Sequence, residues 1–136
     1  MSNFEQTLSI IKPDAVERNL TEEIKSIFLK NELSIKDNKK IHITKEEAAE
    51  FYKVHQSKPF YNDLCSYLAS GPIVVMILEG TNAVAVNRKI MGSTDPKNAE
   101  KNTIRKLYGI SIDKNSVHGS DSIENAKKEI DFFFKN

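Results

Sequence analysis

Three histidines are the first candidates for chemistry in this sequence. His42 lies between two isoleucines in a polar, strand-like segment, so we expect it on the surface. His55 precedes a turn with Lys and Pro and suits the C-terminal end of a helix. His118 stands just before a well-marked helix start, where free N–H groups and the helix dipole favour anions. A neutral imidazole at such a point can attack phosphorus without a separate base.

The residues after His118 fit this chemistry. Gly119 allows a close backbone approach, and Asp121 and Glu124 have the spacing of a capping box, which marks the helix start. We expect Ser120 and Glu124 to orient the imidazole ring. The local pattern leaves a second interpretation open, in which His118 is an ordinary loop histidine beside a helix cap.

Phosphate binding would have to depend on side chains. The sequence has neither a P-loop pattern nor Gly-x-Gly-x-x-Gly, and it contains only five glycines. Lys12, at the end of a strand, and Arg88 and Arg105 are candidate phosphate ligands, although each alone also fits an ordinary surface charge. No His/Cys cluster has the spacing of a structural zinc site.

The elements that must position these residues alternate between strand and helix. Apolar runs predict strands at 8–11, 35–43 and 73–78, with a short extended piece at 117–119. The second strand is polar in its middle, which places it near a sheet edge. Helical spacing predicts helices at 20–28, 44–54, 61–69, 82–91 and 123–133, with N-caps at Thr21 and Thr44 and a polar loop at 92–102. We therefore predict one domain over residues 1–136, an α+β fold with a ferredoxin-like antiparallel sheet of split βαβ repeats covered by helices.

Composition indicates a soluble globular protein. Of the 136 residues, 39% are hydrophobic and 29% charged, and 20 Lys and Arg nearly balance 19 Asp and Glu, so we expect no specific nucleic-acid or membrane partner. We expect the single cysteine, Cys65, to be a buried structural thiol. The N-terminus lacks a signal-peptide pattern, and the apolar run 73–78 is too short to cross a bilayer, so we expect a cytoplasmic location.

Several segments carry a resemblance to a known family. The segment 115–121, Asn-Ser-Val-His-Gly-Ser-Asp, resembles the active-site signature Asn-x-x-His-Gly-Ser-Asp of nucleoside diphosphate kinases. The segments 11–16, 58–61, 70–74, 88–96 and 103–105 resemble further blocks of that family in its order and spacing. The resemblance covers nearly the whole chain.

The resemblance implies a ping-pong reaction with broad base specificity. A nucleoside triphosphate, typically ATP, would give its γ-phosphoryl group to His118, and a nucleoside diphosphate would remove it, with Mg²⁺ held mainly by the nucleotide phosphates. It also implies roles for individual residues: Lys12 and Asn115 at the sugar, Arg88, Thr94 and Arg105 at the phosphates, Tyr52 beside the histidine, Phe60 stacked on the base, and Leu64 and Ile112 completing an apolar slot.

The sequence also departs from the family's habit. Leu107 replaces a usual acidic residue, Lys101-Asn102 replaces a frequent pair ending in glycine, and Asn19 and Glu22 stand where glycines are common. The chain ends at Asn136, without the longer tail of hexameric eukaryotic members. The resemblance implies a homo-oligomer, and these departures leave homotetramer and homohexamer both open. Two other functions are alternatives, a non-catalytic nucleotide-binding or protein-interaction module and a purely structural domain. The complete set of polar residues matched to the family, together with His118, favours the enzyme.

Overall fold

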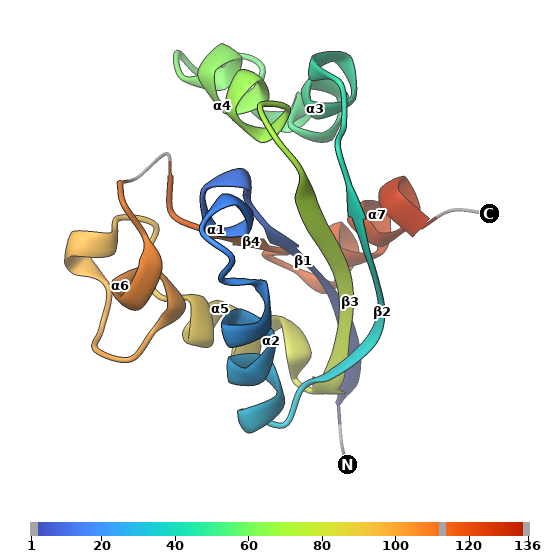
Figure 1. Cartoon of the computed structure of the whole chain (residues 1–136). Helices are drawn as coiled ribbons and strands as arrows, with labels where there is room; N and C mark the ends of the chain where they lie inside the picture. The colour runs from blue at the N-terminus through green and yellow to red at the C-terminus, as the bar shows by residue number, and fades with distance from the viewer. Residues whose placement is uncertain (1–2, 112–113, 135–136) are drawn as a thin grey trace.

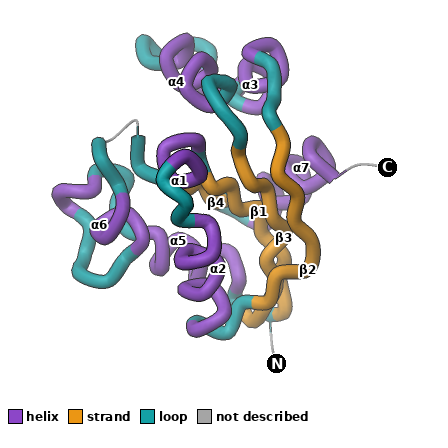
Figure 2. The backbone as a smooth tube through the Cα atoms, viewed as in Figure 1, coloured by secondary structure: helices purple, strands orange, loops and turns teal. Residues whose placement is uncertain are grey.

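Four strands form one antiparallel sheet in the order β2-β3-β1-β4 (Figures 1 and 2). A computed structural model describes residues 3–111 and 114–134. The strands are β1 (Phe4–Ile11), β2 (Ser34–Ile41), β3 (Ile73–Thr81) and β4 (Val117–Gly119). The predicted α+β, ferredoxin-like antiparallel sheet is confirmed, and β2 lies at the edge as its polar sequence indicated.

The alternation of side chains along the central strands builds two cores. On β3, Val74, Met76 and Leu78 face one core, whereas Ile73 and Val75 face the other. A β-strand points successive side chains to opposite faces, so a continuous apolar run requires cover on both sides. Cys65 is buried in the second core, as expected.

Helices provide that cover on both faces (Figure 1). Helix α7 packs on β1 from one face, α1, α2 and α5 lie over the other, and α3 and α4 form a hairpin at one end of the sheet. In the described part of the chain, no helix is both long and apolar enough to span a membrane. The bounds are α1 (Pro13–Glu17), α2 (Thr21–Lys30), α3 (Lys45–Phe51), η1 (Lys53–His55), α4 (Tyr61–Leu68), α5 (Ala83–Met91), η2 (Pro96–Asn98), α6 (Ile104–Tyr108) and α7 (Ile123–Phe134).

Local signals at helix starts had mixed outcomes. The Thr44 capping box is confirmed, because its side chain accepts from Glu47 N while Glu47 accepts from Thr44 N. Thr21 is not a cap, since α2 already includes it and Leu20 occupies the cap position without a side-chain bond. The short helices α1 and α6 were not predicted, because five residues show too little periodicity to be recognised.

Two of the asparagines that replace usual family glycines adopt the positive φ that glycine favours. Asn19 has φ of 60° and Asn102 has φ of 72°. Asparagine tolerates the left-handed region better than most side chains. These substitutions therefore preserve the turns that glycine would form, whereas Glu22 lies in the first turn of α2, where a carboxylate suits the helix dipole.

Gly92 gives a direct test of the packing between α5 and α6. It has φ of +85°, and a Cβ there would lie 2.5 Å from Thr103 Oγ1, the oxygen that caps α6. We expect Gly92→Ala to lower the free energy of unfolding by about 2 kcal/mol in urea titrations, from strain and overlap together. Gly71→Ala is the matched control, because the nearest heavy atom, Pro13 Cβ, would be 3.5 Å away. Equal stability of the two variants would contradict this packing.

Candidate active site

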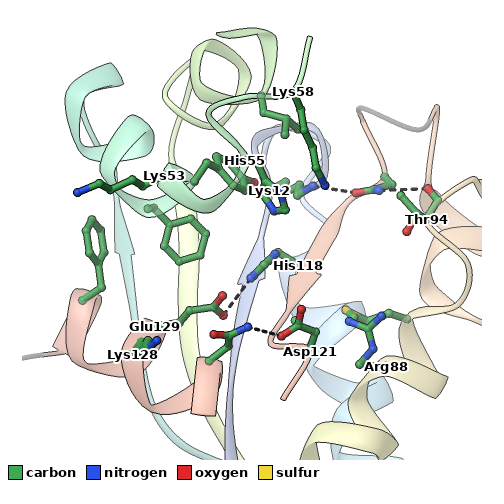
Figure 3. A pocket seen from close by; sticks show the side chains of 18 of the residues that line it. Lys12, Lys53, His55, Lys58, Arg88, Thr94, His118, Asp121, Lys128 and Glu129 are labelled. Atoms are coloured by element: carbon green, nitrogen blue, oxygen red, sulfur yellow. Dashed lines mark hydrogen bonds and ion pairs between the residues drawn. The ribbon is translucent and has the colours of Figure 1, made fainter. Parts of the chain in front are cut away.

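A cavity of about 750 Å³ opens between the helical hairpin, β4 and α7 (Figure 3). This volume lies within the usual range for small-molecule sites. Cations outnumber carboxylates in its lining: Lys12, Lys53, Lys58, Arg88, Arg105 and Lys128 against Glu50, Asp121 and Glu129. The charge of the cavity therefore favours an anionic ligand, although the chain as a whole is nearly neutral.

His118 lies in this cavity because of how the sheet is paired. In the antiparallel register, His118 on β4 stands opposite Ile10 on β1, two residues before Lys12. Ser120 fixes the end of β4, since its backbone N–H donates to Leu8 O at 3.2 Å and its Oγ accepts from Leu8 N at 3.3 Å. The strand is only three residues long, so these bonds help to hold the histidine in place.

The imidazole ring is oriented by Glu129 on α7 (Figure 3). Glu129 Oε1 lies 3.1 Å from His118 Nε2 and also accepts from Ser120 Oγ at 2.7 Å. An ionised carboxylate only accepts hydrogen bonds, so Nε2 carries the ring hydrogen and Nδ1 carries the lone pair. Within residues 3–111 and 114–134, no group is hydrogen-bonded to Nδ1. The arrangement presents one ring nitrogen as a nucleophile.

Aromatic rings enclose the histidine on the side of α3. The Phe51 ring meets the imidazole edge-on with centroids 5.2 Å apart, and the Tyr52 ring does so at 6.5 Å. Tyr52 is buried, and this burial raises its pKa, so the phenol is neutral at physiological pH. These rings restrict the imidazole without adding charge next to it.

The predicted role of Glu124 is wrong. Its side chain is exposed and does not line the cavity, whereas Glu129 makes the contact with His118. The helix start also differs from the predicted capping box of Asp121 and Glu124: Ser122 Oγ accepts from Asn125 N, and Asp121 accepts from the Asn125 side chain. At 3.6 residues per turn, Glu124 and Glu129 project from different sides of α7.

Arg105 is held rigidly beside β4. Its guanidinium donates to Gly92 O at 3.0 Å and to Val117 O at 2.9 Å, and its Nε is buried without a partner among the described residues. Burial, with a smaller effect of Arg88, lowers the pKa of Arg105 to about 10, so it remains a cation at neutral pH. Because Arg105 also supports two backbone carbonyls, it contributes to the fold as well as to the charge of the cavity.

Lys12 and Asn115 form a polar pair on the cavity wall. Lys12 Nζ donates to Asn115 Oδ1 at 2.9 Å, and Asn115 Nδ2 donates to Thr94 O at 3.1 Å. This chain of bonds connects the end of β1 to the loop after α5. It brings together three predicted site residues that lie far apart in the sequence.

The cavity collects most of the predicted site residues. Its lining includes Lys12, Tyr52, Phe60, Leu64, Arg88, Thr94, Arg105, Asn115 and His118, while Ser120 lies directly behind the histidine. Ile112, the remaining predicted member, lies outside the described residues. Among the described residues, no three His, Cys, Asp or Glu side chains are grouped as a metal site.

Sequence reasoning missed His55, Lys58 and Glu129. His55 was expected only to cap a helix, but it lines the cavity, and burial followed by the charges of Lys58 and His118 lowers its pKa. The signal available for His55 and Lys58 was their position between Tyr52 and Phe60, two residues already assigned to the site. For Glu129 the available signal was its position three residues after Ala126 and four before Phe133, which places a carboxylate on the apolar face of the last helix.

Comparisons with known proteins agree with one another over nearly the whole chain. A family model described as nucleoside diphosphate kinase matches residues 5–136. Curated nucleoside diphosphate kinases from a Nitratiruptor species and from Rhizorhabdus wittichii are each 58% identical over 131 residues, covering 96% of this chain and 96% and 94% of theirs. The crystal structure of the Aquifex aeolicus nucleoside diphosphate kinase superposes with a TM-score of 0.95 at 41% identity, covering 98% of this chain and 96% of that one.

The contact between Glu129 and His118 can be tested by nitrogen-15 NMR of the histidine rings at mildly alkaline pH. In the unaltered protein we expect the His118 shifts of a single tautomer with hydrogen on Nε2. Glu129→Ala removes the acceptor, so the shifts should move toward a mixture of both tautomers. Glu124→Ala is the matched control and should leave them unchanged. A mixture of tautomers in Glu124→Ala, or an unchanged single tautomer in Glu129→Ala, would contradict the contact between Glu129 and His118.

Proposed function

This chain belongs to the nucleoside diphosphate kinase family, and we propose that His118 Nδ1 is the atom that carries the phosphoryl group between its substrates. The enzyme transfers the γ-phosphoryl group of a nucleoside triphosphate to a nucleoside diphosphate. The observation that supports His118 as the carrier is the hydrogen bond from Nε2 to Glu129, which leaves the lone pair on Nδ1.

In the first half-reaction, Nδ1 forms a bond to the γ-phosphorus as the bond from phosphorus to the β,γ-bridging oxygen breaks. The electron pair of that bond leaves with the nucleoside diphosphate. The phosphorylated ring is then a cation that keeps its Nε2 hydrogen beside the Glu129 carboxylate, so no proton has to be removed. The second half-reaction is the same step in reverse with a different diphosphate as acceptor.

The cations of the cavity supply the electrostatic stabilisation. Arg88 and Arg105, with Thr94, would hold the phosphates, and the fixed position of Arg105 means that little reorganisation accompanies the transfer. Lys58 and neutral His55 line the same cavity and would add contacts to the phosphate chain. Positioning and charge, with one nucleophile, account for the chemistry that phosphoryl transfer needs.

The nucleoside would lie between the hairpin and the loop before β4. Phe60 is 43% exposed and lines the cavity with Leu64, so its ring is accessible for stacking on a base. Stacking accepts any base, because every base has a π face. The Lys12–Asn115 pair would meet the ribose hydroxyls. This division explains broad base specificity without readout of base edges.

Mg²⁺ would enter with the nucleotide. Bound to the phosphates, it would neutralise part of their charge. The residues present fit such an ion, since cations line the cavity for the phosphates and Asp121 adds a carboxylate at the same cavity. A hydrogen bond from Asn125 lowers the pKa of Asp121 and keeps it ionised.

We also propose that the chain forms a homotetramer or homohexamer and acts in the cytoplasm. The resemblance to the family supports self-association, and exposed large apolar side chains such as Phe4, Leu107 and Ile110 would be available for contacts between subunits. Leu107, which replaces a usual acidic residue, is 52% exposed.

Intact-mass measurement tests the carrier. After incubation with ATP and Mg²⁺ we expect one added phosphoryl group per chain, labile to acid and removed by added nucleoside diphosphate. His118→Ala should show no adduct, because the nucleophile is gone. An adduct that persists in His118→Ala, or no adduct on the unaltered protein, would contradict the proposal.

A further inference from the structure

A buried carboxylate, Asp14, connects three segments behind the cavity. It lies near the start of α1, two residues after Lys12, and is 6% exposed. One of its oxygens, Oδ1, accepts from the Tyr67 hydroxyl on α4. The other, Oδ2, accepts from Ser116 Oγ at 2.8 Å and from Arg18 Nη2 at 2.9 Å. Asp14 does not line the cavity, and phosphoryl transfer through His118 makes no use of it.

The hydrogen bond from the Tyr67 hydroxyl to Asp14, called here the Tyr67 arm, connects Asp14 to α4 on the hairpin side of the proposed nucleotide site. Tyr67 lies one helical turn after Leu64 on α4, the helix that begins directly after Phe60. Burial and the hydrogen bond to Asp14 raise the pKa of Tyr67, so its hydroxyl remains a donor at any physiological pH. The same hydroxyl accepts from Asp14 N at 3.0 Å. Two bonds therefore fix α4 against the start of α1.

The hydrogen bond from Ser116 Oγ to Asp14, called here the Ser116 arm, connects Asp14 to the segment before β4, on the other side of the proposed nucleotide site. Ser116 is fully buried, has φ of +74° and directly follows Asn115. Its carbonyl accepts from Lys12 N at 2.8 Å, and Arg18 also donates to Tyr108 O at 2.6 Å, at the end of α6. A serine held in the left-handed region needs such partners to keep it there.

The chemistry of these bonds requires a carboxylate. Both Asp14 oxygens accept, one from α4 and one from the loop before β4, whereas an amide would present a donor to one side. A buried charge is costly unless it is paired, and here Arg18 supplies the pairing. The same carboxylate thus holds both of the segments between which the nucleoside would lie.

We propose that Asp14 is a positioning residue that sets the spacing between α4 and the Asn115 segment, and through it the affinity for the nucleoside part of the substrate. This inference rests on the proposed function. Arg88 and Arg105 come from α5 and α6 and do not contact Asp14 itself. Arg105 keeps its bonds to Gly92 O and Val117 O when the hydroxyl of Tyr67 or Ser116 is removed, so the phosphates keep their ligands. Loss of either arm therefore lowers substrate affinity while the maximal rate of transfer is retained.

The test is single-turnover discharge of the phosphorylated enzyme by ADP, with the rate measured over a range of ADP concentrations. Tyr67→Phe removes one arm and Ser116→Ala the other. We expect each to raise the half-saturating ADP concentration about five- to tenfold and to leave the maximal rate within about twofold, since only ground-state contacts are lost. The double variant should show less than the product of the single effects, because both arms end on one carboxylate.

Tyr61→Phe is the matched control. Tyr61 lies on the same helix, but its hydroxyl donates to Ala49 O at 2.7 Å and so joins α4 only to α3. Its half-saturating ADP concentration should equal that of the unaltered enzyme, and thermal unfolding measured on all variants identifies any that fail to fold. If Tyr67→Phe fails to fold, the half-saturating ADP concentration of Ser116→Ala still tests the inference.

Three results would overturn the inference: an unchanged half-saturating concentration in the folded network variants, an equal shift in Tyr61→Phe, or a maximal rate that falls in proportion. These outcomes are separate from failure of the proposed function. In that case the unaltered protein would form no phosphorylated enzyme to discharge.

Discussion

The hydrogen bond between Glu129 and His118 is the contact on which the site depends. It joins a three-residue strand to the long C-terminal helix, and Ser120 ties both to the sheet through Leu8. Because α7 packs along β1, the position of the carboxylate is set by the core rather than by a loop. A ring held at one nitrogen presents the other in a fixed direction, which reduces the cost of reaching an in-line geometry.

The antiparallel sheet explains how residues far apart in sequence meet at this point. Pairing of β1 with β4 puts His118 opposite Ile10, so the chain leaving β1 places Lys12 beside Asn115. The arginines arrive separately, from α5 and α6, and Arg105 is anchored on backbone carbonyls. The proposed contacts to the nucleoside and those of the two arginines to the phosphates therefore come from different elements, which is the basis for the proposed role of Asp14.

Short-range signals predicted much of the fold, and long-range geometry explains what they missed. The Thr44 capping box and the apolar run of β3 are local, and both were identified correctly. Glu129 was missed because its contact with His118 depends on how α7 packs on β1, although its spacing from Ala126 and Phe133 places it on the inward face of that helix. His55 was assigned a local role because its place in the cavity depends on a long-range contact, that of the neighbouring Phe51 and Tyr52 rings with His118. The roles of the matched residues came from family resemblance, which spacing alone could not supply.

The contact between Glu129 and His118 is tested most directly by identifying which ring nitrogen is phosphorylated. Phosphorus-31 and nitrogen-15 correlation NMR on the phosphorylated enzyme, kept at alkaline pH, distinguishes the two isomers of phosphohistidine. Because Glu129 occupies Nε2, we expect phosphorus bonded to Nδ1 of His118. Phosphorus bonded to Nε2, or to any other residue, would contradict it.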